Sequence, residues 1–287
     1  MYFKTPLRYP GGKGKLTDFV KLILAQNNLI GGEYIEPYAG GAGIAINLLL
    51  DGYVRHVHLN DLNRSVYSFW RAIFESTEQF CNKISNTPIT MHEWCLQKEI
   101  QLNPSKHSLF DLGFSTFFLN RTNRSGIIRA GVIGGKKQDG AWRLDARFNR
   151  GELVERIQAL KAFRKQVSLY NFDAAAFVQQ VLPTLPCDAL VYFDPPYFVK
   201  GHGLYENHYS LADHEKIAEL VQAKVKHPWL VSYDHVAEIC SLYAKCGSLT
   251  YSVSYSAQAR YRGAEAMFFS RSLCIPVVDS PTSLMAA

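Results

Sequence analysis

Residues 34–61 read YIEPYAGGAGIAINLLLDGYVRHVHLND, and this stretch decides the fold. A short strand over 34–36 runs into a loop with three glycines, and the apolar run 44–50 then predicts a helix. A second strand is predicted over 54–59, and it ends at Asn60-Asp61. Such strand–loop–helix–strand units build parallel sheets that bind ligands at the carboxyl ends of their strands.

The same alternation of strands and helices resumes after residue 150. Residues 189–193, ALVYF, are nearly all apolar, as expected of a strand that is buried on both faces. A helix over 16–24 precedes the first strand. We therefore predict an α/β fold with a Rossmann-like, doubly wound sheet. Its later elements are predicted as helix 153–163, strand 167–170, helix 175–181, strand 189–193, helix 211–225, strand 229–233, helix 236–244 and strands 249–255 and 266–270.

The segment between these two halves follows a different pattern. Val66, Phe69, Trp70, Ile73 and Phe74 recur at helical spacing, which predicts one amphipathic helix. The basic, glycine-rich residues that follow show no apolar periodicity and predict long surface loops. We interpret residues 63–150 as an inserted, mostly helical domain, residues 1–62 and 151–278 as the core, and residues 279–287 as a flexible tail.

Composition restricts the class of protein. The chain is 47% hydrophobic and 20% charged, the profile of an ordinary soluble protein. It contains no apolar run long enough for a membrane span and no secretory leader, so we expect a cytoplasmic protein without a membrane partner. The six cysteines include no Cys-x-x-Cys pair, which favours reduced thiols and argues against a zinc site.

Positive charge gathers in one part of the chain. The formal net charge is +6, but residues 121–150 alone contain eight lysines and arginines against Asp139 and Asp145. A local excess of this size is typical of a surface that binds phosphates, and a solvated polar surface is the alternative. The basic residues are Arg121, Arg124, Arg129, Lys136, Lys137, Arg143, Arg147 and Arg150.

The glycine loop after the first strand is a candidate ligand site. Glycines allow a ligand to approach the backbone closely, and the next helix presents an electropositive N-terminus. The loop has neither the Gly-Lys-Ser/Thr of a phosphate-binding loop nor the spacing of the dinucleotide fingerprint. Asp61 has two open interpretations: it binds the hydroxyls of a ribose, or it caps the helix that begins near Ser65.

Asp194-Pro195-Pro196-Tyr197 is the most specific chemical signal in the sequence. It places a carboxylate, a carbonyl and an aromatic ring together after a buried strand. An adenine amino group is a poor nucleophile, because its lone pair is delocalised into the ring. Hydrogen bonds to the Asp194 carboxylate and the Pro195 carbonyl would direct that lone pair at an electrophilic methyl group, and Tyr197 could stack on the base.

These motifs resemble the Dam-type (D12 class, alpha group) DNA adenine-N6 methyltransferases over nearly the whole chain. The resemblance implies S-adenosyl-L-methionine as cofactor and direct methyl transfer to an adenine flipped out of double-stranded DNA. The Phe that is more usual at Tyr38 is absent. The implied catalytic residues are Asp194, Pro195 and Tyr197, and the implied cofactor-binding residues are Tyr9, Lys13, Glu36, Tyr38, Gly40, Asp61, Phe172, Asp173 and Asp194.

The inserted segment resembles the target-recognition region of the same family. Arg129 matches an arginine that reads guanine there, a base whose O6 and N7 suit a guanidinium group. The family's wedging tyrosine and neighbouring asparagine are replaced by Arg124 and Ser125, so the resemblance leaves open the recognition sequence, GATC or another, and the manner of base extrusion. Each arginine has base reading and phosphate contact as open alternatives. The implied DNA-binding residues are Arg8, Arg121, Arg124, Arg129 and Arg260.

Other functions remain compatible with these residues. A cytosine-N4 or RNA methyltransferase would share every cofactor residue, although a serine in place of Asp194 is typical of cytosine-N4 enzymes. A nucleotide- or DNA-binding protein without catalysis is a further alternative, against which the intact Asp194, Pro195 and Tyr197 argue. No metal is implied. A restriction endonuclease that acts on the same DNA sequence is a candidate partner.

Overall fold

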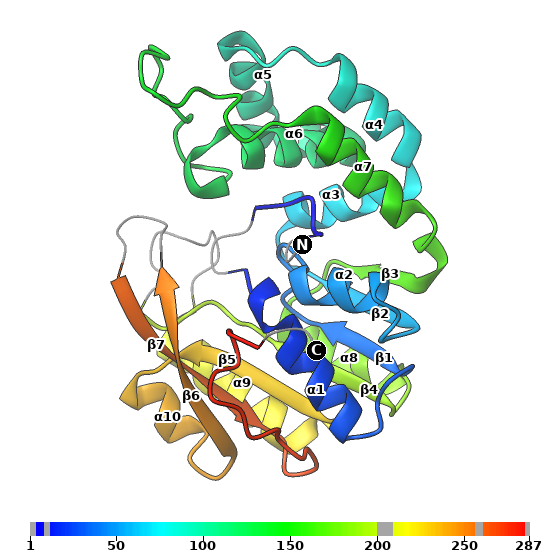
Figure 1. The fold of residues 1–287 in the computed structure, drawn as a ribbon, viewed down its shortest axis with the longest axis vertical. Coiled ribbons are helices and arrows are strands. Elements are labelled where there is room, and N and C mark those ends of the chain that lie inside the picture. The colour runs from blue at the N-terminus through cyan, green and yellow to red at the C-terminus, as the bar shows by residue number, and fades with distance from the viewer. Residues whose placement is uncertain (1–3, 9–11, 200–208, 256–260, 285–287) are drawn as a thin grey trace. The chain divides into compact units, whose positions relative to one another are not determined.

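The structure is a computed structural model that describes residues 4–8, 12–199, 209–255 and 261–284. The chain forms two compact units, both drawn in Figure 1. Among the described residues, the sheet unit comprises 13–62 and 166–284, and the helical unit comprises 4–8, 12 and 63–165.

The sheet unit is built on a seven-stranded sheet in the described part of the chain, with the strand order β3-β2-β1-β4-β5-β7-β6. The first five strands of that order pair in parallel, and β7 pairs antiparallel with both β5 and β6. The order reverses between β1 and β4, which is where open α/β sheets bind ligands. The strands are β1 (Glu33–Glu36), β2 (His56–Asn60), β3 (Val167–Tyr170), β4 (Ala189–Phe193), β5 (Trp229–Asp234), β6 (Gly247–Tyr255) and β7 (Tyr261–Phe269).

Helices cover both faces of this sheet (Figure 1). One face carries α1 (Thr17–Gln26), which follows the short helix η1 (Gly14–Leu16), and α2 (Gly43–Leu50). A continuous apolar core lies on the other face, under α8 (Ala174–Gln180), η5 (Leu182–Thr184), α9 (Leu211–Lys224) and α10 (Ala237–Leu242). All five residues of β4 are buried, as the apolar run predicted. The doubly wound, Rossmann-like α/β fold is therefore confirmed.

The helical unit packs around aromatic side chains. Phe69 of α3 stacks on Phe117 of α6, with ring centroids 6.1 Å apart, and Phe80 of α4 meets both rings edge-on. The stretch 127–149 contains no helix, which agrees with the predicted loops. The helices are α3 (Arg64–Glu75), α4 (Thr77–Asn86), α5 (Met91–Leu102), η2 (Pro104–Lys106), α6 (Leu109–Thr122), η3 (Arg124–Gly126), α7 (Arg150–Lys161) and, at the boundary with the sheet unit, η4 (Arg164–Gln166).

The two compact units differ from the predicted domains at two boundaries. Helix α7 was assigned mostly to the core, but it belongs to the helical unit, where Lys161 forms a 2.6 Å ion pair with Glu78 of α4. Residues 4–8 also belong to the helical unit. The functional division of the chain, and the flexible tail at 279–287, stay predictions. Within the described ranges, no helix is both long and apolar enough to cross a bilayer.

Candidate active site

Asp194 lies directly after β4, at the carboxyl edge of the sheet. Pro195-Pro196 follows, and proline offers no backbone N–H to a neighbour. The two residues after Tyr197 are held by Asp234 at the end of β5, whose carboxylate accepts 2.9 Å hydrogen bonds from the backbone N–H groups of Phe198 and Val199. The ends of two adjacent parallel strands thus fix the turn that carries the predicted catalytic residues.

Lys13 joins three side chains of this edge. Its Nζ lies 3.3 Å from Asp194 Oδ1 and 3.8 Å from Glu265 Oε1 of β7. The same ammonium stands over the ring of Tyr197, 4.5 Å from its centroid, in cation–π geometry. Residues far apart in sequence therefore assemble one site, in which a carboxylate and an aromatic face lie next to a cation.

Asp194 is held largely out of water. Burial raises the pKa of its carboxyl above the ordinary value, while Lys13 and a hydrogen bond from Ser232 lower that pKa in part. The Ser232 Oγ lies 2.6 Å from Asp194 Oδ1. The Asp194 side chain is 21% exposed, so part of its carboxylate remains accessible to solvent.

Glu36 ends β1 and lies under the glycine loop. It is 4% exposed, and its Oε1 accepts a 3.2 Å hydrogen bond from Ala45 N in the first turn of α2. Burial raises the pKa of Glu36 to about 8, and the nearby charge of Asp194 raises it further against that hydrogen bond. Gly43 lets the start of α2 lie close to the backbone of η1, because a Cβ at residue 43 would lie 3.3 Å from Gly14 N.

Asp61 and the glycine loop are joined directly. Gly40, at a φ of +47°, donates its N–H to Asp61 Oδ2 at 2.8 Å. The cap of α3 is Asn63, whose side chain accepts from Ser65 N, and Asp61 is not the capping residue. The capping interpretation of Asp61 is therefore wrong. A carboxylate beside the glycine loop is what the ribose-binding interpretation requires.

Asn60 links three segments of the predicted cofactor site. Its Nδ2 donates to the carbonyl oxygens of Pro37, at 2.9 Å, and Phe172, at 3.0 Å. Its Oδ1 accepts from Phe172 N at 2.9 Å. Asn171 adds a 2.7 Å hydrogen bond from its Nδ2 to the Asp61 carbonyl. Sequence reasoning did not single out Asn60, although its position at a strand end is the signal that could have identified it.

The remaining predicted cofactor residues border these loops. The Tyr38 hydroxyl lies 2.8 Å from that of Tyr209, and burial raises the pKa of Tyr38 well above its ordinary value. Phe172 is 38% exposed. Asp173 caps α8, with its Oδ1 accepting the N–H groups of Ala175 and Ala176. Tyr9, the last of the set, lies outside the described residues.

The predicted DNA contacts fall into two groups in the helical unit. Arg124 and Arg129 are exposed near the turn at Ser125-Gly126. Arg121 is buried, at 7% exposure, and its Nη2 donates to the Pro6 carbonyl. Burial lowers the pKa of Arg121 to about 9, with further lowering from Arg156 and Arg8. In this position Arg121 supports the 4–8 segment, whereas a surface contact was expected. Arg260 lies outside the described residues.

Arg8 is held by its backbone. The Asn120 side chain accepts from Arg8 N at 2.8 Å and donates to Arg8 O at 2.7 Å, and it also donates to Gly126 O at 2.8 Å. Gly126 has a φ of +75°, and a Cβ there would lie 2.3 Å from Arg8 O, so the position requires glycine. Arg8 is thereby fixed beside the turn that precedes Arg129.

Several residues at the carboxyl edge of the sheet escaped sequence reasoning. Ser232, Asp234 and Glu265 reach the site through the pairing of β5 with β4 and β7. Tyr251 of β6 donates a 2.7 Å hydrogen bond to Glu265. Among the residues that the structure describes, no cluster of His, Cys, Asp and Glu is arranged to hold a metal ion.

Comparisons with known proteins give one family. Residues 9–257 match D12 class N6 adenine-specific DNA methyltransferases. A curated relative, the modification methylase StsI of Streptococcus sanguinis, is 22% identical over 231 residues. That match covers 76% of this chain but 32% of the relative, so the chain spans about a third of the relative's length.

Two solved structures of the rRNA methyltransferase aviRa from Streptomyces viridochromogenes also align with the chain. They share 12% and 11% identity with it, at TM-scores of 0.40 and 0.37. The alignments cover 92% and 90% of this chain, and 87% and 84% of the solved chains. TM-scores this low support no conclusion about this chain.

Proposed function

The chain belongs to the D12 class N6 adenine-specific DNA methyltransferase family, and from this premise we propose its specific reaction. It transfers a methyl group from S-adenosyl-L-methionine to the N6 amino group of an adenine that is flipped out of double-stranded DNA. The transfer is direct, without a covalent enzyme intermediate. The observation that carries the proposal is the assembly of Asp194, Lys13 and Tyr197 at the carboxyl edge of the sheet.

The residues of the sheet unit fit the proposed cofactor. S-adenosyl-L-methionine supplies an electrophilic methyl group on a positively charged sulfur. The acidic side chains Glu36, Asp61 and Asp194 lie at the carboxyl ends of three neighbouring strands, and they suit a ligand with cationic groups and ribose hydroxyls. Gly40 and Gly43 allow close approach of the backbone. Phe172 and Asp173 would border the adenine of the cofactor, with Tyr38 and Lys13 completing the site.

The chain's own groups would activate the target base by orientation. The Asp194 carboxylate and the Pro195 carbonyl would accept hydrogen bonds from the two amino hydrogens, so that the nitrogen lone pair points at the methyl group. The bound cofactor would supply the methyl group and keep the electron pair of the bond that it gives up. Asp194 would accept one amino proton as the methylated nitrogen forms and would then pass it to water. Tyr197 would hold the base by stacking, as aromatic side chains do with nucleobases.

The helical unit would select which adenine is methylated. Arg124 and Arg129 are exposed, next to a turn of fixed geometry. Arg8 is fixed beside the same turn through Asn120. Arg129→Ala should relax one base position of the methylated sequence and cost roughly 1–3 kcal/mol in discrimination. Mapping of methylated sites measures this, and a uniform loss over all sequences would identify Arg129 as a phosphate contact.

A direct assay tests the reaction itself. Purified protein is incubated with methyl-labelled S-adenosyl-L-methionine and either duplex DNA or RNA, and the modified base is identified after complete digestion. We expect N6-methyladenine in DNA. Label in N4-methylcytosine or in RNA would replace this proposal with the corresponding methyltransferase. Binding of the cofactor without transfer to any nucleic acid would indicate a non-catalytic protein.

The partner of the reaction is a separate proposal. The curated relative is named a modification methylase, and such a name favours a restriction endonuclease that cuts the same sequence. Methylated sites mapped in DNA from cells that express this chain define the sequence to be tested. Protection of those sites against a candidate endonuclease would support the pairing, and cleavage of fully methylated sites would contradict it.

A further inference from the structure

Two hydroxyl groups lie beneath the catalytic carboxylate in the interior of the sheet. Ser232 on β5 is 0% exposed, and Tyr192 on β4 is 2% exposed. The Tyr192 Oη lies 2.8 Å from Ser232 Oγ, and Ser232 Oγ lies 2.6 Å from Asp194 Oδ1. The three side chains therefore form a continuous hydrogen-bonded row across two adjacent strands.

The direction of the row follows from the acceptor at its end. An ionised carboxylate only accepts hydrogen bonds, so Ser232 must donate its single O–H to Asp194 Oδ1. The Ser232 oxygen can then only accept from its other neighbour, and Tyr192 must donate to it. Burial raises the pKa of Tyr192 well above its ordinary value, so this tyrosine keeps the proton that it donates.

Both described donors to Asp194 use the same oxygen. Ser232 Oγ and Lys13 Nζ contact Oδ1, and Oδ2 has no hydrogen-bond partner among the described residues. The terminal torsion of an aspartate is broad and nearly two-fold, so a free carboxylate would exchange its two oxygens. Two donors on one oxygen remove this equivalence and leave Oδ2 for another partner.

We propose that Ser232 is a positioning residue for methyl transfer, with Tyr192 as its orienting partner: the pair engages Oδ1 of Asp194 so that Oδ2 is presented to the amino group of the target base. This role rests on the adenine methyl transfer proposed above. The pair also favours the ionised carboxylate, because a hydrogen bond to a charged acceptor is about twice as strong as one between neutral groups. Lys13 also contacts Glu265 and the Tyr197 ring. In the hydrogen-bonded row, by contrast, Ser232 donates to Asp194 and Tyr192 donates to Ser232.

Three variants separate positioning from simple stability. Ser232→Ala removes the donor, Ser232→Thr keeps it, and Tyr192→Phe keeps the aromatic ring but leaves Ser232 without its orienting partner. Ser168→Ala is the matched control, because Ser168 is a serine on β3 whose hydroxyl is also bonded to a titratable side chain, His56 at 2.9 Å. Each variant is assayed for turnover, for the dissociation constants of cofactor and duplex DNA, and for the pH profile of turnover.

The expected pattern is specific. Ser232→Ala should lower turnover by about tenfold to a hundredfold, and both dissociation constants should remain within about twofold of the wild type. The acidic limb of its pH profile should move to higher pH, because loss of the donor raises the pKa of Asp194. Ser232→Thr should restore both turnover and profile. Tyr192→Phe should shift both in the same direction by less, and Ser168→Ala should match the wild type.

A second readout does not need turnover. The carboxyl carbon of Asp194 is followed by NMR in protein labelled at aspartate, with Asp194→Asn used to assign the signal. Ser232→Ala should raise the midpoint of this titration, and Ser168→Ala should not. If Ser232→Ala does not fold, as judged by its thermal unfolding, Tyr192→Phe carries both tests.

The outcomes separate the inference from the proposed function. If the wild type transfers methyl groups but Ser232→Ala keeps the wild-type turnover and pH profile, the positioning role is wrong. A loss of thermal stability without a shift of the acidic limb or of the Asp194 titration would also overturn it, in favour of a structural role. A wild type without methyl transfer would contradict the proposed function, while the titration would still test the hydrogen-bonded row.

Discussion

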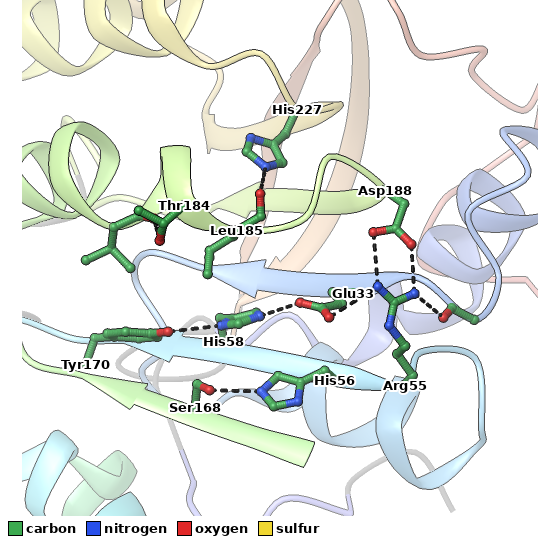
Figure 2. Close-up of polar contacts among 12 residues, drawn as sticks. Glu33, Arg55, His56, His58, Ser168, Tyr170, Thr184, Leu185, Asp188 and His227 are labelled. Carbon is green, nitrogen blue, oxygen red and sulfur yellow. Dashed lines mark hydrogen bonds and ion pairs between the residues drawn. The ribbon is translucent and has the colours of Figure 1, made fainter. Parts of the chain in front are cut away.

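Strand β1 has a glutamate at each end, and the two ends differ in how their charge is balanced. Glu33 at the amino end accepts from His58 Nε2 at 2.7 Å and pairs with Arg55 at 3.2 Å (Figure 2). Glu36 at the carboxyl end is buried, with a backbone N–H of Ala45 as a hydrogen-bond donor. One carboxylate is matched by side chains of opposite charge or by a histidine, and the other is kept near further acids.

The contrast extends to the neighbours of each glutamate. At the amino end, Arg55 also bonds both carboxylate oxygens of Asp188 and the Gly31 carbonyl, and His58 Nδ1 lies 3.2 Å from the Tyr170 hydroxyl (Figure 2). At the carboxyl end, Asp194 and Glu265 share the ammonium of Lys13. A network satisfied by its own partners stabilises the sheet, whereas acids in excess of nearby cations leave capacity for a positively charged ligand.

The largest effect should come from the loss of Asp194 at the carboxyl edge of the sheet. Asp194→Ala should lower methyl transfer by about a hundredfold to a thousandfold, because a preorganised acceptor is lost at the reacting group. DNA affinity should be nearly kept, since phosphate contacts supply most of it. Asp188→Ala, at the opposite edge, is the control and should leave turnover unchanged. Methyl transfer is measured as the initial rate of label incorporation. Equal losses of this rate in both variants would contradict a functional difference between the two edges of the sheet.

The second effect concerns the pH dependence of stability through Glu36. Its pKa is raised to about 8 in the folded protein, from an ordinary value of 4.5, by burial. The folded state therefore binds the proton more tightly than the unfolded chain, and stability falls as pH rises from about 4.5 to 8. Glu36→Gln should remove this loss and stabilise the ligand-free protein by roughly 3 kcal/mol near pH 7 to 8.

Urea unfolding at a series of pH values measures this change. The same variant should bind S-adenosyl-L-methionine more weakly, because a cationic ligand gains from an ionised Glu36. Proton release on cofactor binding, measured in two buffers of different ionisation enthalpy, should disappear in Glu36→Gln. A variant whose stability profile follows that of the wild type would show that Glu36 is not protonated in the free protein.

The smallest effect should come from the other end of the strand. Glu33→Gln removes the charge shared by Arg55 and His58 and should destabilise the fold by about 1–2 kcal/mol. Turnover at a permissive temperature should not change, because these residues lie at the amino end of the sheet. The measurement is the midpoint of urea unfolding alongside the initial rate. A selective loss of turnover without loss of stability would mean that the amino end takes part in the reaction.

The sequence predicted the sheet unit well, because its signals are local. Short apolar runs marked the parallel strands, and the acids directly after two of them marked Asp61 and Asp194. Strand β7 begins at Tyr261 in the structure, whereas the prediction began at 266, because the apolar pattern covers only the buried end of a long antiparallel hairpin. Local signals of this kind cannot show where a hairpin is first paired.

Partners that depend on strand pairing or on packing could not be predicted. Ser232 and Glu265 meet Asp194 and Lys13 only through the register of β5 and β7. Arg121 was expected at the surface because a charge pattern treats every arginine as solvated. In the structure the side chain of Arg121 is buried, and its guanidinium group donates a hydrogen bond to the Pro6 carbonyl. Charge density in the sequence does not distinguish a buried arginine such as Arg121 from the exposed Arg124 and Arg129.

Asn60 has a consequence for how the proposed cofactor site can change during evolution. One fully buried amide joins the loops at Pro37 and Phe172 to the end of β2. A loop grafted at either position would have to place its backbone carbonyl within reach of the same amide, so the geometry of each loop depends on that of the other. Chimeras that exchange both loops together with the end of β2 should fold and bind the cofactor. We therefore expect these three segments to change together during evolution.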